Sequence, residues 1–261
     1  MEVKLTQMTP NPVRAIEEAA SNCYDSKPGD GRIMRACFRS GHYAVLEFAT
    51  FTFHITGVSR ALLAQLTRHR HAGYAVRSQR YCSEDGANFV WPHTIKANPQ
   101  AELIYMKFLE EAKSAYSTLQ SLGIPNEDAR YVLPNACETT LEFTCNLREL
   151  IHIMNERLCN RAQWEIKELC QKMREEVIAA EPAFADFLQP KCEHLGYCPF
   201  TPYLKLAHDY RDHDLRRRKQ RAVPKGMDGR GSAPGTTATI LVRTGTKTLD
   251  GDVAVPYVQL D

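Results

Sequence analysis

The sequence of 261 residues lacks an apolar run of about 18 residues, a Cys-x-x-Cys pair, an internal repeat and a large net charge. Without such a run we expect no transmembrane helix. The N-terminal stretch MEVKLTQMTPNPVR also lacks the apolar core of a signal peptide, so we expect a soluble, cytoplasmic protein. The 33 basic and 31 acidic residues leave a net charge of only +2. Bulk charge therefore does not favour nucleic-acid binding, and any anion site must be local.

The nine cysteines are expected to be reduced thiols, because no export signal accompanies them. Cys192 and Cys198 flank His194, an arrangement that could hold a metal. The four ligands that a structural zinc needs are not evident around them, however. We therefore predict no metal site and interpret this segment as a short ordered turn.

Hydrophobic patterning predicts an α+β protein, in which a small antiparallel or mixed sheet packs with several long helices. Aromatic and polar residues alternate over 48–55, which is typical of a half-buried strand, and 141–145 has the same character. Residues 100–122 have the spacing of an amphipathic helix. Other helices are expected over 12–20, 32–39, 58–69, 147–158 and 162–180, with a short one after Pro125 and a loop over 92–99. In 162–180 one apolar face contains Ile166, Leu169, Met173 and Val177.

The composition changes near Tyr203. Residues 204–221 are densely charged, and 222–238 are rich in Gly, Pro, Ser and Thr. We expect a catalytic domain over 1–203 and an extension over 204–261 that includes a linker or mobile tail and a hairpin around Leu249. The basic run RRRKQR at 216–221 is ordinarily a solvated face, and nucleic-acid or partner binding is the alternative.

The segment Arg68–Tyr81 concentrates positive charge at the end of a predicted helix, where we expect it to run into a loop. It contains four arginines and two histidines, which repel one another unless anions lie among them. Arginine forks and the Ser78 hydroxyl suit phosphate oxygens. The sequence therefore predicts a phosphate-binding segment, and a basic surface loop with ordinary salt bridges is the alternative.

Arg68-His69-Arg70 is followed by seven residues and then by Ser78-Gln79-Arg80-Tyr81. This pattern resembles the signature of the flavin-dependent thymidylate synthases. Other segments resemble the same family in its order and approximate spacing, and the resemblance extends from near the N-terminus to about residue 203. These segments are Phe51-Thr-Phe-His, Gln65, Asp128-Ala-Arg-Tyr-Val-Leu-Pro134, Asn146-Leu-Arg-Glu-Leu, Arg157 and Ala162-Gln-Trp-Glu-Ile166.

The resemblance implies both a fold and a reaction. Members of the family are homotetramers whose active sites form between subunits, and they bind FAD, dUMP and methylenetetrahydrofolate. NADPH reduces the flavin, and the uracil is reductively methylated at C5 to give dTMP. The flavin would supply the redox chemistry, and the protein would supply orientation and electrostatics.

The resemblance also implies residue roles. The FAD contacts would be Arg68, His69, Arg70, Asn146, Arg148 and His152. The dUMP contacts would be Gln65, Arg68, Ser78, Gln79, Arg80, Arg130 and Arg157. Arg157 would also be catalytic, since a cation beside the uracil polarises it and favours loss of its N3 proton.

Several of these residues have a simpler interpretation. Arg157 could merely pair with Glu165, and Arg130 could cap the helix that it ends. His152 could be a satisfied helix histidine, and Gln65 could make a polar core contact.

The sequence departs from the family pattern at six positions: Ala44, Val45, Gly73, Ala75, Val76 and Arg77. Most of these changes remove polar groups or a turn-setting proline, while Arg77 adds a charge. An active synthase with a repacked site is one explanation, and the same chemistry on UMP is another. The third is a nucleotide- or nucleic-acid-binding relative without catalysis.

Overall fold

The computed structural model describes residues 1–24, 27–200, 242–249 and 253–260. The chain forms two compact units, Met1–Arg221 and Ala222–Asp261. In the second unit β5 (Val242–Leu249) pairs antiparallel with β6 (Val253–Leu260), which confirms the predicted hairpin. The predicted linker over 204–238, and the boundary after residue 203, lie outside the described residues.

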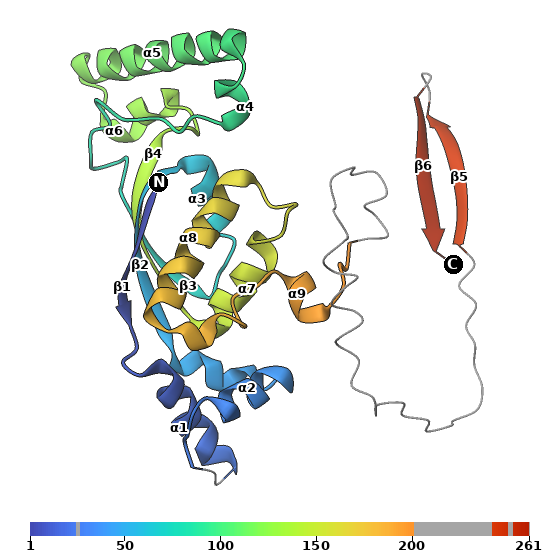
Figure 1. Cartoon of the computed structure of the whole chain (residues 1–261). Coiled ribbons are helices and arrows are strands. Elements are labelled where there is room, and N and C mark those ends of the chain that lie inside the picture. The colour runs from blue at the N-terminus through green and yellow to red at the C-terminus, as the bar shows by residue number, and fades with distance from the viewer. Residues whose placement is uncertain (25–26, 201–241, 250–252, 261) are drawn as a thin grey trace. The chain divides into compact units, whose positions relative to one another are not determined.

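A four-stranded antiparallel sheet forms the centre of the first unit, in the order β1-β2-β4-β3, with helices on one side (Figure 1). The predicted α+β class is confirmed. The strands are β1 (Glu2–Met8), β2 (Thr50–Ser59), β3 (Ala72–Val76) and β4 (Glu138–Asn146).

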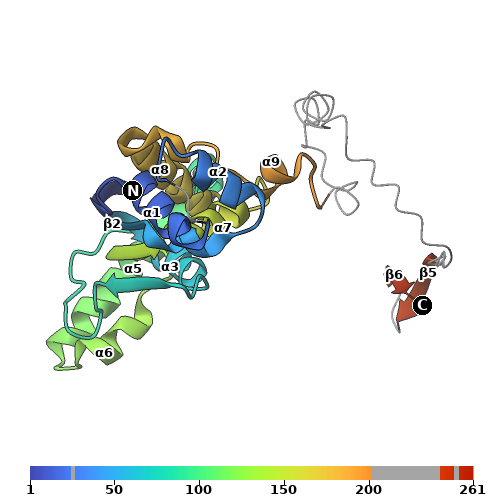
Figure 2. The same ribbon diagram turned by 90° about the horizontal axis from the view of Figure 1, so that it is seen from below.

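Buried and more exposed side chains alternate along β4, and along β2 as far as Ile55, which gives the sheet two different faces. Phe51, Phe53 and Phe143 are fully buried on the helix-covered face, where the rings of Phe53 and Phe143 lie 6.2 Å apart. The opposite face presents polar residues: Thr52 Oγ1 donates to Thr144 Oγ1 at 3.0 Å, and His54 Nδ1 lies 2.6 Å from Glu142 Oε1. This second face has no covering helix in the described part of the first unit (Figures 1 and 2).

Helices α7 and α8 cover the apolar face, and α1 and α2 lie together at one end of the sheet (Figure 1). Glu17 of α1 accepts hydrogen bonds from the backbone of Gly29 and Ile33, which stabilises the start of α2. The apolar face predicted in α8 is completely buried. The elements are α1 (Pro12–Tyr24), α2 (Arg32–Arg39), η1 (Tyr43–Phe48), α3 (Arg60–Leu66), α7 (Leu147–Arg157), α8 (Trp164–Ala180), η3 (Pro182–Phe184) and α9 (Lys191–Leu195).

At the other end lie α4 (His93–Lys96), α5 (Pro99–Ser121), α6 (Asn126–Ala129) and η2 (Arg130–Val132). The helix predicted over 100–122 is confirmed, but its apolar side is only partly covered. Leu109 and Tyr116 are buried, whereas Leu103, Ile104 and Phe108 are 49%, 70% and 50% exposed.

Three local predictions were wrong. Residues 72–76 form a strand, not a loop, because they pair with β4 and pack Tyr74 against Phe143. The loop predicted over 92–99 contains the short helix α4. The helix predicted from residue 58 begins at Arg60, since Ser59 ends β2 and caps the helix by accepting from Leu62 N.

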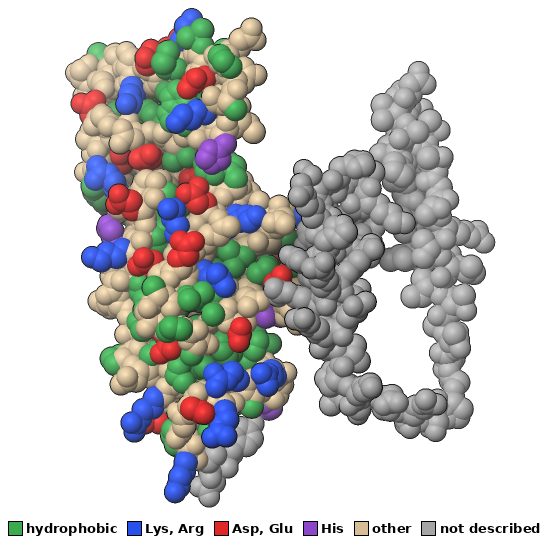
Figure 3. Space-filling model, viewed as in Figure 1, with side chains coloured by type: hydrophobic (Ala, Val, Ile, Leu, Met, Phe, Trp, Pro, Cys, Tyr) green, Lys and Arg blue, Asp and Glu red, His purple; other side chains and the backbone are tan. Residues whose placement is uncertain are grey.

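Surface charge in the first unit is mixed. On the face drawn in Figure 3, basic and acidic side chains are interspersed over the described residues. No helix among the described residues is long and apolar enough to cross a membrane.

Candidate active site

Two strand-to-helix junctions position most of the predicted site. At the end of β2, the Ser59 backbone N–H and hydroxyl donate to the Glu165 carboxylate at 2.7 and 2.6 Å, which fixes the start of α3 on α8. At the end of β4, the Asn146 side chain caps α7 by accepting from Glu149 N at 2.9 Å. The first junction leads through α3 to Arg68 and His69, and the second leads directly to Arg148 and His152.

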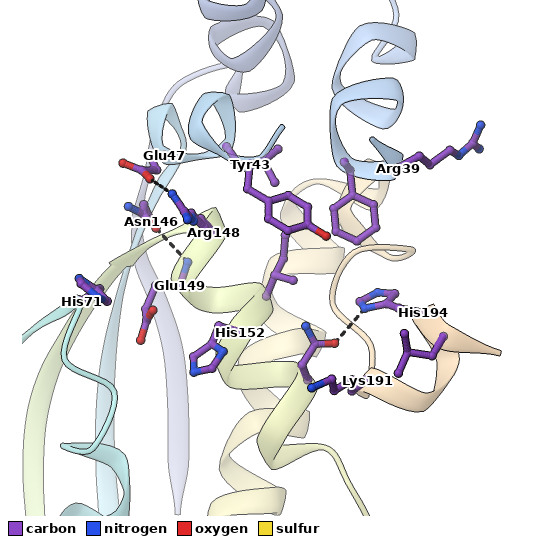
Figure 4. A pocket seen from close by; sticks show the side chains of 15 residues that line it. Arg39, Tyr43, Glu47, His71, Asn146, Arg148, Glu149, His152, Lys191 and His194 are labelled. Atoms are coloured by element: carbon purple, nitrogen blue, oxygen red, sulfur yellow. Dashed lines mark hydrogen bonds and ion pairs between the residues drawn. The ribbon is translucent and has the colours of Figure 1, made fainter. Parts of the chain in front are cut away.

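A cavity of about 900 Å³ lies beside the first turns of α7 (Figure 4). Three predicted flavin contacts, Asn146, Arg148 and His152, line it. Arg148 Nη1 is held by Glu47 Oε1 at 2.6 Å, so its guanidinium is fixed at the edge of the cavity. Polar and aromatic groups around a concave space of this size suit a large cofactor.

Sequence reasoning missed the other wall of this cavity. It is lined by Phe38, Arg39, Tyr43, Lys191 and His194. Phe38 packs edge-on against His194, whose Nδ1 lies 2.8 Å from Asn155 Oδ1. The short helix α9 brings His194 there, and its sequence pattern indicated only a turn.

His69 and Arg157 lie together although they come from different segments. His69 is 5% exposed, and its Nε2 accepts a hydrogen bond from Arg157 Nε at 3.0 Å. The rings of His69 and His152 are 5.6 Å apart, edge to face. Burial, together with the charges of Arg157 and His152, lowers the pKa of His69 to about 4. His69 is therefore neutral near pH 7.

The proposed alternative for Arg157, a salt bridge with Glu165, is not observed. Both carboxylate oxygens of Glu165 accept from Ser59 instead. Arg157 thus has no carboxylate partner among the described residues.

Arg68 and Arg70 are exposed and have no carboxylate partner in the described part of the chain. Gln65 is half-buried one turn earlier, and its carbonyl accepts from Arg68 N at 3.3 Å. Two exposed guanidinium groups that come from positions two residues apart and have no carboxylate partner favour an anionic ligand.

The other predicted nucleotide contacts lie in a second group near α6. Arg80 Nε pairs with Glu127 Oε2 at 2.9 Å, and Arg130 Nε donates to the Glu127 carbonyl at 3.0 Å. Arg130 therefore makes the helix-capping contact that was the alternative to ligand binding. Ser78 Oγ accepts from Arg80 N, and Gln79 Nε2 lies 3.6 Å from a cysteine sulfur. The alternative to phosphate binding was a basic loop with ordinary salt bridges. Arg80 forms such a salt bridge, whereas Arg68 and Arg70 form none with the described residues.

The departures from the family pattern fall mainly on β3 and η1. A Cβ atom at Gly73 would lie 2.7 Å from Thr144 Cγ2 on the paired strand, so a serine there requires Thr144 to shift. Ala75 lies opposite Glu142 in the same register. Val45 is buried in the core, which explains an apolar residue at that position.

No cluster of three or more metal-binding side chains occurs among the residues that the structure describes. The residues around the cavity instead supply hydrogen-bonding groups and charges of both signs, from Arg39, Arg148 and Lys191 on one hand and Glu47 and Glu149 on the other. An antiparallel sheet covered by helices on one side, with a large cavity of polar, charged and apolar side chains at the start of α7, defines an α+β protein with a candidate ligand-binding site.

Sequence comparison identifies the family. Residues 4–183 match the family described as "Thymidylate synthase complementing protein". The chain is 39% identical over 212 residues to a flavin-dependent thymidylate synthase of Geobacter sulfurreducens, covering 76% of this chain and 91% of the relative. It is 43% identical over 167 residues to that of Pyrococcus furiosus, covering 61% and 68%. The chain belongs to the flavin-dependent thymidylate synthase family.

Solved structures share the fold. Thymidylate synthase X of Helicobacter pylori, crystallised with FAD and dUMP, is 24% identical and has a TM-score of 0.61, covering 72% of this chain and 99% of that one. The UMP/dUMP methylase PolB of Streptomyces cacaoi is 22% identical with a TM-score of 0.64, covering 71% and 93%.

Proposed function

We propose that this chain reductively methylates dUMP at C5 to give dTMP, with methylenetetrahydrofolate as carbon donor and FAD reduced by NADPH. The observation that carries the proposal is the hydrogen bond between Arg157 and His69, whose ring lies beside the cavity residue His152. The exposed residues Arg68 and Arg70 flank His69 in the chain. Family membership supports the same reaction.

The residues present fit FAD. The cavity at α7 is large, and its wall offers the amide of Asn146, the guanidinium of Arg148 and the ring of His152. Arg68 and Arg70 can hold the pyrophosphate, since guanidinium forks match phosphate oxygens. His69 would contact the flavin from its buried position. When bound and reduced, FAD supplies the reducing equivalents for the methylation.

Arg157 is the proposed catalytic residue. Its cationic guanidinium would lie beside the uracil and stabilise negative charge as the N3 proton is lost. Gln65 would hold the nucleotide on the same side. The phosphate of dUMP would be bound by Arg68 and, from the second group, by Ser78, Gln79, Arg80 and Arg130.

We further propose that the active enzyme is a homotetramer with shared sites. Within one chain Arg80 and Arg130 lie by α6, whereas Arg148 and His152 lie on α7, and Figures 1 and 2 show these helices in different regions. A second copy would bring one group to the other. The exposed apolar side chains of α5 are also suited to a protein interface.

The catalytic domain is proposed to span 1–203, with 204–261 as an extension, because curated relatives match about three quarters of the chain. Since NADPH and folates are cytoplasmic co-substrates, we place the enzyme in the cytoplasm. Nucleic acid is not a proposed partner: the mixed charge of the face in Figure 3 offers no extended basic surface there.

An anaerobic turnover assay tests the reaction. Purified protein is supplied with FAD, NADPH, methylenetetrahydrofolate and either dUMP or UMP, with Arg157→Ala as control. Formation of dTMP that the control lacks supports the proposal. Methylation of UMP alone would move the chain to the alternative substrate, and the small residues Gly73 and Ala75 are compatible with that outcome. No product and no bound flavin would overturn catalysis in favour of a binding role.

A further inference from the structure

The hydrogen bond between Arg157 and His69 fixes the position of one proton. Arg157 Nε carries a hydrogen and can only donate, so the Nε2 atom that accepts from it, 3.0 Å away, must be unprotonated. His69 is neutral near pH 7 because burial and two neighbouring charges lower its pKa to about 4. The single ring proton of His69 must therefore lie on Nδ1.

Glu149 lies on the side of the ring that carries this proton. Its Oε1 is 3.8 Å from His69 Nδ1, which is longer than a hydrogen bond but close enough for a carboxylate to favour an N–H facing it. The Glu149 side chain is 8% exposed and lines the cavity. Among the described residues no group donates a hydrogen bond to this carboxylate.

The backbone holds both partners rigidly. Glu149 is in the first turn of α7, where its N–H is fixed by the Asn146 cap. The Tyr74 hydroxyl lies 2.7 Å from the His69 carbonyl and 2.8 Å from the Leu66 carbonyl, and so ties the turn after α3 to β3. Figure 4 shows the Glu149 carboxylate projecting from α7 between His71 and His152.

We propose that Glu149 is a positioning residue for Arg157, acting through His69: the carboxylate holds His69 as the Nδ1–H tautomer, whose free Nε2 orients the guanidinium. This inference rests on the proposed function for its catalytic consequence. Its structural part, the tautomer of His69, stands or falls independently.

The consequence for Arg157 follows from donor geometry. With Nε bound to His69, the N–H groups of Nη1 and Nη2 stay available for a substrate and point in a fixed direction. If His69 carried its proton on Nε2, two N–H groups would face each other and the hydrogen bond would be lost. Arg157 would keep its charge but lose its orientation, so the rate should fall more than nucleotide affinity.

The tautomer is measured first, on the full chain with isotopically labelled histidine, by ¹³C and ¹⁵N chemical shifts of the imidazole rings. The His69→Gln variant assigns the signal. The proposal expects a neutral Nδ1–H ring in the wild type between about pH 6 and 8, and a partial shift to the Nε2–H form in Glu149→Gln. An Nε2–H ring in the wild type, or an unchanged ring in the variant, would overturn it.

The catalytic part is tested with Glu149→Gln, which keeps the side-chain size and removes the charge. We expect kcat for dTMP formation to fall about 10- to 100-fold, as for other partners that orient a functional side chain, while the Kd for dUMP changes less than about threefold. Glu149→Asp should recover part of the rate. The control Glu18→Gln, which breaks only the exposed Arg14–Glu18 pair, should not change it.

The two possible failures are distinguishable. If Glu149→Gln binds dUMP and turns over like the wild type, the positioning role is wrong and the proposed function stands. If the wild type forms no dTMP but His69 is Nδ1–H and responds to Glu149→Gln, the proposed function fails and the Glu149–His69 relationship is supported. Should Glu149→Gln fold poorly, the same tautomer measurement is made on Glu149→Asp, whose shorter side chain moves the carboxylate away from Nδ1: a shift towards the Nε2–H form supports the proposal, and an unchanged ring overturns it.

Discussion

Arg157 Nε donates to His69 Nε2 at 3.0 Å, joining the last turn of α7 to the turn after α3 across 88 residues of sequence. This contact links the histidine of the Arg-His-Arg signature to the proposed catalytic arginine. Because His69 is buried and neutral, it orients the guanidinium without neutralising it.

Replacing Arg157 with lysine tests the need for that orientation. Lysine keeps the charge but cannot donate from Nε to His69 while presenting two further nitrogens to a ligand. We expect kcat to fall by at least about 100-fold, in the range seen when one charge-stabilising donor is removed, with FAD still bound. The measurement is anaerobic dTMP formation, with exposed Arg14→Lys as the matched control. A variant within a few-fold of the wild type would contradict the assignment.

The depressed pKa of His69 makes folding stability depend on pH. The folded pKa of about 4 lies below the unfolded value of about 6.5, so the unfolded chain binds more protons between these values. The stability that His69 contributes is complete above pH 6.5 and is lost as the pH falls towards 4, by up to about 3 kcal/mol. Among the described residues, the ionisable side chains near it include Glu149, His152, Arg157 and Tyr74, whose hydroxyl donates to the His69 carbonyl.

Urea unfolding of the wild type and of His69→Gln at pH 7 and pH 4.5 measures this effect. The variant should lose less stability than the wild type over that interval, because other titrating groups cancel in the comparison. Equal losses in both proteins would show that His69 does not titrate abnormally.

Thr144, the residue paired with Gly73 on β4, leaves too little room for a side chain at position 73. Gly73→Ser places a Cβ against Thr144 Cγ2, so we expect a loss of about 1–3 kcal/mol in the free energy of unfolding. Thr144→Ser removes the obstructing methyl and keeps the hydroxyl, so the double variant should regain most of the loss. Thermal unfolding of the single and double variants makes the comparison.

Ala75→Ser is the control for this series, since residue 75 lies on the same face of β3 and already carries a Cβ. It should change stability by no more than about 0.5 kcal/mol. A Gly73→Ser protein as stable as the wild type would mean that Thr144 moves aside without cost.

Shared active sites are tested by mixing two defective chains. Arg80→Ala removes one residue of the group near α6, and Arg148→Ala removes one residue of the cavity wall. If each site combines these groups from two subunits, each of the two subunits carries the intact residue in about half of the cases after random co-assembly. About a quarter of the sites then have both residues, so the mixture should regain about a quarter of wild-type activity. Each variant alone supplies the baseline. A mixture that remains as inactive as the separate variants would place both residues in the same subunit's site.

The local pattern of apolar and polar residues predicted much of the architecture. The period-2 alternation of 48–55 and 141–145 predicted the two central strands, and the periodic helices 100–122 and 162–180 were confirmed. The edge strands were missed. β1 and β3 are short, and β3 holds its conformation through pairing with β4 almost 70 residues away. Such long-range pairing is not contained in a local pattern.

The resemblance to a known family predicted the residues of the candidate site, whereas charge patterning predicted only a phosphate-binding segment. How the site residues lie relative to one another was not predicted. Charge patterning treated Arg68, Arg77 and Arg80 alike. The structure distinguishes them, because Arg77 and Arg80 pair with Glu84 and Glu127 while Arg68 has no carboxylate partner in the described residues. The Glu149 contact was not predicted, because no local pattern brings Glu149 to His69, which lies 80 residues earlier in the chain.

The most direct test of the central claim is a single-turnover experiment. Protein whose FAD has been chemically reduced is mixed anaerobically with dUMP and methylenetetrahydrofolate, and dTMP is quantified over time for the wild type and Arg157→Lys. The account predicts about one dTMP per reduced flavin in the wild type and a rate at least about 100-fold lower in the variant. A wild type that keeps its flavin reduced without forming dTMP, or a variant of equal rate, would contradict it.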